Sequence, residues 1–349
     1  MSAPVTVAVD ANGADLGVAE VAAGAALAAA RDGIDVILFG PAAEIGDVPD
    51  GVSVVDAPVS IAKAADPAQA VRSTPEASVV RTTRAVAAGD ADAFVAAGST
   101  GAAIAAGLFN VKRARGIHRP ALAISIPIPG APVLMLDVGA NVEVRPEHLV
   151  QFAFMGAAFA RAVLGVPRPR VGLLSNGEEA AKGTPDVVAA HALIAERMAG
   201  IGGLEFAGNV EGTDVSAGTV DVVVTDGFTG NVALKLIEGV SQAIFGAVRD
   251  VAQSSPRSKA GGLLLRPALR RFRDEIDPEG LGGAYVLGLR RIAVVPHGRF
   301  SRVGFANAIE VAARAVREEV VDRTQAALLE AGALQRAPSG TAASFSAST

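Results

Sequence analysis

Short apolar runs alternate with longer helical repeats along the chain, and this alternation predicts most of the fold. Continuous runs rich in β-branched residues indicate buried strands, and they lie at Val5–Asp10, Val36–Phe39, Val52–Val55, Ala93–Ala96, Ala121–Ile126, Val133–Asp137, Arg170–Leu174, Glu205–Ala207, Val222–Val224 and Ile292–Val295. Helical spacing indicates helices at Val18–Arg31, Val79–Val86, Pro146–Val163 and Ala306–Leu329, and Gly282–Tyr285 indicates a turn. The β-α-β order predicts an α/β fold, with a mostly parallel, doubly wound sheet in three α/β/α layers.

The stretch from Asp221 to Lys235 shows how a strand passes into the next helix. Val222–Val224 has the pattern of a strand covered on both faces, Asp226 ends it, and helical spacing resumes at Val232. Gly230 permits a close backbone approach or a positive φ. The free amides of a helix N-terminus attract anions such as phosphate. An ordinary turn with a capping side chain explains the same residues.

Glycine and polar residues recur wherever a strand is predicted to end. They occur at Asp10–Gly13, Gly98–Gly101, Asp137–Asn141, Ser175–Gly183 and Gly208–Gly212. The carboxyl ends of parallel strands meet at one edge of a sheet, and ligands of open α/β folds bind there. We therefore expect these loops to share one edge and one anion-binding site.

Composition narrows the chemistry. The chain has no cysteine, which excludes disulfides, thiolate metal sites and a cysteine nucleophile, and which fits a reducing compartment. Its four histidines are not at metal-ligand spacing, and its net charge of −5 argues against general nucleic-acid binding. The N-terminus has no signal-peptide pattern, and no uninterrupted apolar run is long enough to span a bilayer. We expect a cytoplasmic protein without a metal.

Segment 254–276 is basic and amphipathic, unlike the rest of the chain. Its apolar residues Leu265, Leu269, Phe272 and Ile276 share one helical face, and its basic residues are Arg257, Lys259, Arg266, Arg270, Arg271 and Arg273. Such a segment can lie on an anionic membrane surface or dock an acidic partner. A core-packing helix with a solvated basic back is the third interpretation. We assign residues 1–332 to one α/β/α domain and 333–349 to a disordered tail.

Several stretches resemble the PlsX family, the phosphate acyltransferases of bacterial phospholipid synthesis. The most specific are LDVGANVEVRPEHLVQFAFMG, GNVEGTDVSAGTVDVVVTDGFTGNVALK, GGAYVLGL and FANAI, and the likeness runs from about Val5 to Ala333. It implies the fold of the phosphotransacetylases and the isopropylmalate dehydrogenase group, and a homodimer without a cofactor. It also implies transfer of a long-chain acyl group from acyl carrier protein to inorganic phosphate. The family is cytoplasmic and peripherally membrane-associated, where a membrane glycerol-3-phosphate acyltransferase uses the acyl phosphate.

The resemblance and the strand-end loops together suggest the site residues. Phosphate is itself the nucleophile, so the protein must orient it, stabilise the oxyanion and help the thiolate leave. We assign the catalytic roles to Lys182, Asn231 and His297. The predicted substrate and phosphate site comprises Asp10, Gly13, Ser99, Thr100, Gly101, Asp137, Asn141, Glu178, Asp226 and Gly230, in which the aspartates orient donors. The predicted partner or membrane surface comprises Arg257, Lys259, Leu265, Arg266, Leu269, Arg270 and Arg273, together with Arg290, Arg291, Arg299 and Arg302.

The chain departs from the family pattern at three places. Asn12 and Ala14 stand in a loop that usually reads Asp-Ala-Met-Gly-Gly-Asp, Ser99 replaces an asparagine, and 72–78 lacks the expected lysines. Three other functions remain possible: a dehydrogenase of the isopropylmalate type, a short-chain phosphotransacetylase that uses coenzyme A, and a non-catalytic membrane scaffold. The dehydrogenase lacks support because no Gly-x-Gly-x-x-Gly follows the first strand.

Overall fold

The computed structural model describes residues 4–128 and 132–334, which form one eleven-stranded sheet. The strand order is β3-β2-β1-β4-β11-β10-β5-β6-β9-β7-β8. The strands are β1 (Val5–Asp10), β2 (Ile34–Gly40), β3 (Val52–Asp56), β4 (Ala93–Ala96), β5 (Ala121–Ile126), β6 (Val133–Leu136), β7 (Arg170–Leu174), β8 (Glu205–Val210), β9 (Val222–Val224), β10 (Ala284–Leu287) and β11 (Ile292–Val295). Every predicted strand is present. The turn expected at Gly282–Tyr285 is confined to Gly282 and Gly283, because β10 begins at Ala284.

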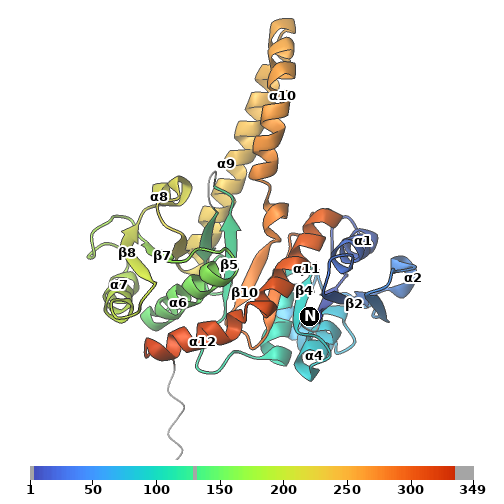
Figure 1. The fold of residues 1–349 in the computed structure, drawn as a ribbon, viewed down its shortest axis with the longest axis horizontal. Coiled ribbons are helices and arrows are strands. Elements are labelled where there is room, and N and C mark those ends of the chain that lie inside the picture. The colour runs from blue at the N-terminus through green and yellow to red at the C-terminus, as the bar shows by residue number, and fades with distance from the viewer. Residues whose placement is uncertain (1–3, 129–131, 335–349) are drawn as a thin grey trace, which may run out of the picture.

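Helices cover both faces of the sheet (Figure 1), which confirms the three-layer α/β/α prediction. One face carries α1 (Val18–Ala29), α2 (Ala42–Ile45), α6 (Pro146–Ala162), α7 (Pro185–Met198), α11 (Arg302–Arg317) and α12 (Val320–Glu330). The other carries α3 (Pro67–Ser73), α4 (Ser78–Ala88), α5 (Thr100–Ala106) with the π-helical turn η1 (Gly107–Val111), α8 (Gly212–Ala217) and the start of α9 (Gly227–Gln253). The remaining helices are α10 (Pro256–Glu275) and the short 3-10 helix η2 (Pro278–Leu281).

The sheet is mostly parallel, but its two halves run in opposite directions. Strands β1, β2, β3, β4 and β11 are mutually parallel, as are β6, β9, β7 and β8, and the antiparallel strands β10 and β5 lie between the two groups. The carboxyl ends of the first group therefore lie at one edge, which we call the upper edge. Those of the second group lie at the opposite, lower edge. The expectation that all strand-end loops share one edge was wrong.

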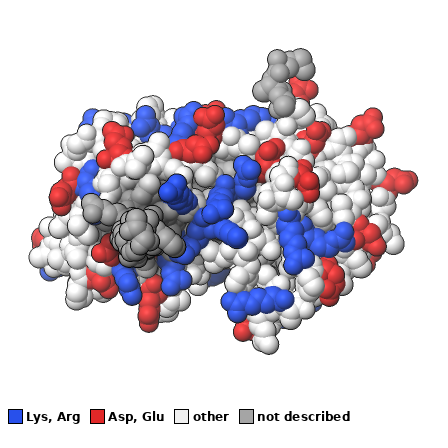
Figure 2. All heavy atoms as spheres, turned by 90° about the horizontal axis from the view of Figure 1, so that it is seen from below, with Lys and Arg blue, Asp and Glu red and all other residues white. Residues whose placement is uncertain are grey.

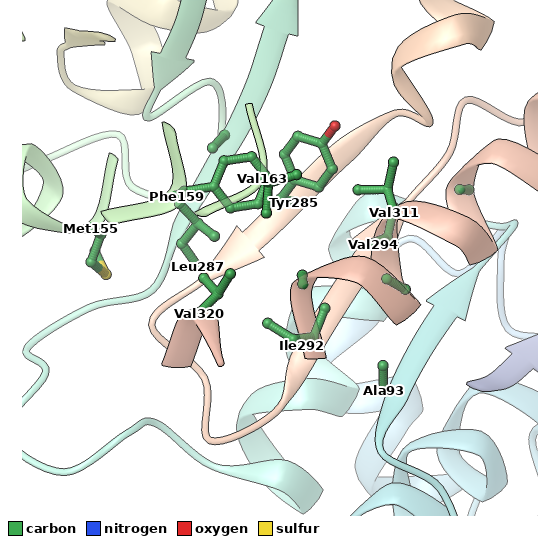
Figure 3. Packing of buried hydrophobic residues seen from close by; sticks show 14 of the residues in the cluster. Ala93, Met155, Phe159, Val163, Tyr285, Leu287, Ile292, Val294, Val311 and Val320 are labelled. Atoms are coloured by element: carbon green, nitrogen blue, oxygen red, sulfur yellow. The ribbon is translucent and has the colours of Figure 1, made fainter. Parts of the chain in front are cut away.

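Small and branched side chains pack the middle of the sheet against α6, α11 and α12 (Figure 3). Tyr285 on β10 lies against Phe159 of α6, with ring centroids 4.4 Å apart, and its hydroxyl donates to the Leu281 carbonyl at 2.5 Å. Helix α6 approaches the sheet closely at Gly156, where a Cβ would lie 2.6 Å from Val222. The aromatic-poor composition thus fits a core built on close helix–sheet contacts.

Helices α9 and α10 form a hairpin that projects beyond the upper edge of the sheet (Figure 1). The two helices contact each other through Phe245 and Phe272, whose rings are 6.3 Å apart, and through Gly262 against Ala252. Segment 254–276 is therefore a hairpin arm rather than a helix packed on the main core. No helix within the described ranges has the length and apolar character needed to cross a membrane.

The end of the chain differs from the single helix expected at Ala306–Leu329. Glu319 adopts a left-handed conformation with φ 52°, which separates α11 from α12. Beyond α12, Ala333 is buried and its carbonyl accepts a hydrogen bond from Gln151 at 2.8 Å. The disordered tail predicted at 333–349 lies outside the described residues from 335 onward.

Candidate functional site

Three neighbouring strands bring several predicted site residues together at the upper edge. Asp10 and Gly13 follow β1, Ser99–Gly101 follows β4, and His297 follows β11. Gly13 has φ 94°, and a Cβ there would lie 2.6 Å from the Ala62 Cβ and 2.9 Å from the backbone of Gly98. Glycine at this position therefore lets the loops after β1 and β4 touch.

Asp10 lies beneath these loops as a buried carboxyl group. Only 4% of Asp10 is exposed, and burial raises its pKa to about 7. Hydrogen bonds from Ser78 and the Asn12 amide act in the opposite direction and lower the pKa. The Asn12 side chain, which departs from the family pattern, donates to the Ala57 carbonyl at 3.0 Å. Asp10 and Asn12 therefore organise the loop from within.

Segment 72–78, where the resemblance led us to expect lysines, begins with an arginine that packs on an aromatic ring. The Arg72 guanidinium lies over the Phe109 ring, 4.4 Å from its centroid. Such a contact stabilises packing between α3 and η1 through the attraction of a cation to an aromatic face. Arg72 thus has a packing role in this chain.

The N-terminus of α5 leaves two backbone donors without an acceptor among the described residues, whereas in the first turn of α9 the amides of Gly227 and Thr229 are already bonded. Ser99 caps α5 by accepting from the Ala102 amide at 3.4 Å, and the amides of Thr100 and Gly101 have no acceptor among the described residues. In α9 the Asp226 carboxylate accepts from both the amide and the hydroxyl of Thr229, at 2.8 and 2.7 Å. Because a carboxylate already occupies its positive end, α9 is the poorer anion site.

Asp137, Asn141, Asp226 and Gly230 meet at the lower edge, after β6 and β9. The buried Asp137 carboxylate accepts from the amides of Leu122, Gly139, Ala140 and Asn141 and from the Asn141 side chain, at 2.7–3.1 Å. The same side-chain amide of Asn141 donates to the Pro120 carbonyl at 2.7 Å. These groups use their hydrogen bonds to hold the loops together, and a part in phosphate binding stays a prediction for them.

Lys182 and Glu178 lie apart from the upper loops. Both are exposed in the lower-edge loop after β7. Strands β4 and β7 are six positions apart in the sheet, which corresponds to about 29 Å. Within one molecule, the structure therefore does not bring Lys182 to Ser99.

One face of α9 connects the two edges. Asn231, Lys235 and Glu238 are spaced to share a face, and the Lys235 ammonium lies 2.9 Å from the Glu238 carboxylate. Burial lowers the pKa of His297, and the charges of Arg299, Glu238 and Lys235 also act on it. Helix α9 thus begins at the lower edge and reaches His297 at the upper edge. Sequence reasoning missed Lys235, although it closes the motif GNVALK and stands one turn after Asn231.

The predicted docking residues divide into three places. Arg257, Lys259, Leu265, Arg266, Leu269 and Arg270 are exposed on the hairpin, and the side chain of Arg273 lies outside the described part. Arg290 and Arg291 follow β10 at the lower edge, and Arg299 and Arg302 lie at the upper edge. Arg302 is paired with Glu20 at 2.5 Å. The described residues hold no cluster of His, Asp or Glu side chains suited to a metal ion.

Comparison with known proteins identifies the family. A family model described as "Fatty acid synthesis protein" matches residues 5–323. The chain belongs to this family. That result confirms the resemblance seen in the motifs. A phosphate acyltransferase of Magnetococcus marinus is 49% identical over 215 residues, which cover 61% of this chain and 61% of that protein. One of Thermotoga maritima is 41% identical over 214 residues, covering 61% and 64%.

The matched region spans about three fifths of the length of these relatives. Two solved structures of phosphotransacetylases have a fold similar to that of this chain. The EutD phosphotransacetylase of Staphylococcus aureus has a TM-score of 0.60 at 17% identity, covering 90% of this chain and 94% of that one. A phosphotransacetylase of Streptococcus pyogenes also gives 0.60, at 15% identity, over 90% and 94%. At these identities the likeness concerns the fold alone.

Proposed function

We propose that the protein transfers a long-chain acyl group from acyl carrier protein to inorganic phosphate. The observation that carries the proposal is the 49% identity, over 215 residues, to a protein named phosphate acyltransferase. A phosphate oxygen attacks the thioester carbonyl, the carbon–oxygen bond forms and the carbon–sulfur bond breaks. The sulfur leaves as a thiolate that takes up a proton. The acyl phosphate would then serve phospholipid synthesis through a membrane glycerol-3-phosphate acyltransferase.

The upper edge best supports the phosphate site. The amides of Thr100 and Gly101 are available at the neutral N-terminus of α5, and phosphate binds well at such a terminus. Lys235 approaches the same edge along α9 and supplies a cation for the developing oxyanion, while Asn231, one turn nearer the lower edge on the same face of α9, supplies an amide. His297 stands beside Lys235 as the acid for the leaving thiolate. If Lys182 takes part, it must come from a second copy of the chain, because its own loop is too far away.

The activity is tested by release of free thiol from palmitoyl-acyl carrier protein, with and without phosphate, while hydroxylamine traps the product. We expect phosphate-dependent thiol release and a trapped acyl hydroxamate. Coenzyme A thioesters of short chains serve as the comparison, and preference for them would favour a short-chain phosphotransacetylase. If no thioester releases free thiol, the protein is better explained as a non-catalytic membrane scaffold.

Lys235→Met should lower kcat about 100-fold, the typical loss when one stabilising donor is removed from a developing oxyanion. The assay above measures it at saturating phosphate and acyl carrier protein. Lys182→Ala is the parallel variant. Normal turnover of Lys235→Met would exclude the α9 face from the reaction, and normal turnover of Lys182→Ala would remove Lys182 from the site.

An uncovered apolar stripe on α9 supports the expected homodimer. Its members are separated by about one helical turn and are 44–68% exposed, namely Val232, Leu236, Val240, Ile244, Val248 and Val251. A stripe of this length on a projecting helix favours pairing with another helix. We assign a second copy of the hairpin to it.

The hairpin end supports a peripheral membrane contact. Leu263, Leu264 and Leu265 are 67%, 83% and 59% exposed near the turn, next to the basic residues of α10. We expect Leu265→Glu combined with Leu269→Glu to release the protein from anionic vesicles in a flotation assay, because both apolar burial and charge attraction weaken. Leu329→Glu on α12, at a position 70% exposed, is the matched control. Unchanged flotation of the double variant would exclude this segment as the anchor.

A further inference from the structure

A groove lies beside α4 on the outer part of the sheet. Helices α1 and α2 contact β2 and β3 on one face of the sheet. On the other face, α4 packs against β1, β2 and β4 and leaves part of the β2–β3 surface uncovered. The groove between α4 and these two strands has a volume of about 750 Å³, which lies within the usual range for small-molecule sites.

The floor and one wall of the groove are apolar. Ile37 and Phe39, two residues apart on β2, share a face of the sheet with Val55 of β3 and form the floor. Ala85 and Ala88, one turn apart on α4, form the wall. Helix α4 has 11 residues, so the groove beside it is about 16 Å long. This shape favours an extended aliphatic group, whose burial removes apolar surface from water.

Two guanidinium groups lie at the upper end of the groove. Arg81 donates to the Asp56 carbonyl at the end of β3, and Arg84 donates to the Pro75 carbonyl at 3.3 Å, just before α4. Within the described residues, neither arginine takes part in an ion pair. Each guanidinium has five N–H donors, so donors remain for an anion, and their planar arrangement fits a carboxylate.

Two carboxylates on the rim decide the charge and the direction of the ligand. Glu76 stands at the upper end with Arg81 and Arg84, so two positive charges and one negative charge give a net charge of +1 there. A ligand with one negative charge balances this end. Asp90 follows α4 at the lower end of the groove, where it repels an anionic head group. The head group therefore belongs at the upper end.

The open edge of β3 is unsuited to an added strand. A free edge offers unpaired amides and carbonyls to another chain, and natural proteins protect such edges. Here the Asp56 carbonyl already accepts from Arg81, and the Val52 amide donates to the Pro49 carbonyl at 3.2 Å. The strand has only five residues. This protection disfavours a peptide or a second copy of the chain as the occupant.

The groove differs from the other basic surfaces of the molecule. Figure 2 shows Lys and Arg side chains across the middle of the face seen from below, and cations alone attract anions of any kind. The groove is more selective, because its two guanidinium groups adjoin an apolar floor. It is also separate from the candidate phosphate site at α5, since β3 and β4 are three positions apart in the sheet, which corresponds to about 14 Å.

We propose that this groove binds a free long-chain aliphatic monocarboxylate. The carboxylate lies at Arg81 and Arg84, and the chain extends over the floor formed by β2 and β3. The assignment is independent of the proposed function, because it uses none of the groups at which phosphate and thioester would react. A protein that turned over no thioester would keep this site.

Binding is measured by isothermal titration calorimetry of the full chain with dodecanoate, below its micelle concentration. From octanoate to dodecanoate, we expect the affinity to rise about two- to fourfold for each added methylene, because each one is at least half buried on the floor. Acetate, which has the charge without the chain, should not bind measurably.

Variants of α4 locate the site. Ala88→Glu places a carboxylate in the wall of the groove and should weaken dodecanoate binding at least about 10-fold. Ala87→Glu is the matched control, because Ala87 is exposed on the same turn outside the groove, and its effect should stay below about twofold. Arg81→Met combined with Arg84→Met should remove the preference for dodecanoate over dodecanol, since both charged donors are lost.

Other outcomes would overturn the proposal. Absence of dodecanoate binding would do so, as would equal effects of the two glutamate variants, which place binding elsewhere. Tighter binding of dodecyl phosphate would reject a monocarboxylate. A raised KM for palmitoyl-acyl carrier protein in Ala88→Glu alone would assign the groove to the acyl chain of the substrate. A changed sedimentation coefficient of this variant would assign it to a contact between copies. Lack of thiol release by the wild type removes the proposed function and leaves the calorimetric result intact.

Discussion

Gly230→Ala should lower the free energy of unfolding by about 3 kcal/mol, the upper range for overpacking a buried site. Gly230 is buried at the start of α9, and a Cβ there would lie 2.0 Å from the Asp137 carbonyl oxygen and 2.9 Å from Thr225. Neither the carbonyl nor the helix can move without disturbing the Asp137 hydrogen bonds. Urea unfolding of the full chain measures the loss.

Gly239→Ala is the matched control within the same helix. A Cβ added at Gly239 would have no atom within 4 Å among its neighbours in the described structure. Alanine is favoured over glycine in a helix interior by about 0.5–1 kcal/mol, so this variant should be slightly more stable than wild type. Equal effects of the two substitutions would show that helix propensity, rather than the contact with Asp137, determines the role of Gly230.

The free energy of unfolding of the Asp10→Asn variant should increase relative to that of the wild type as the pH rises from 4 to 8. Burial raises the Asp10 pKa from 3.8 to about 7. Between these values the folded chain keeps a proton that the unfolded chain releases, so wild-type stability falls as pH rises through this window. The full difference corresponds to about 4 kcal/mol. Asparagine has no such proton, and its curve lacks this fall.

The measurement is the difference in unfolding free energy between Asp10→Asn and wild type at pH 4, 6 and 8. A pH-independent offset from the new amide group cancels in this comparison. For Glu20→Gln, the difference in unfolding free energy should change with pH in the opposite direction. The hydrogen bond from Arg302 lowers the Glu20 pKa below 4.5, so the ionised carboxylate stabilises the wild type above this pH and loses that effect as the pH falls. A flat difference for Asp10→Asn would mean that Asp10 titrates as an exposed carboxyl group.

The elements with strong local patterns were predictable from the sequence. All of Val222–Val224 is buried, and so is every residue from Leu149 to Ala160 of the helix that begins at Pro146, so these apolar runs show directly in the sequence. Strand β10 was not predictable, because it is short and follows Gly282 and Gly283, which signal a turn. The break at Glu319 was hidden because apolar spacing continues on both sides of one left-handed residue.

The site was predictable in its parts but not in its arrangement. Asp10, Ser99 and Asp137 were found because polar residues end apolar strands. Their grouping was missed because two antiparallel strands in the middle of the sheet reverse its direction. Strand order and direction come from contacts between residues far apart in the chain, and no local pattern records them. Lys235 was missed for the same reason, since only the position of α9 across the sheet places it beside His297.

The sequence by itself determined the family, the α/β class, the loops that carry chemistry and the basic amphipathic character of the hairpin. These properties depend on residue type and on spacing within one element, which the linear order preserves. Only the tertiary structure decided which loops share an edge, that Lys182 lies far from Ser99, and that segment 254–276 projects beyond the sheet as part of a hairpin. Those facts depend on how distant strands pair, because pairing converts separation along the chain into proximity or distance in space.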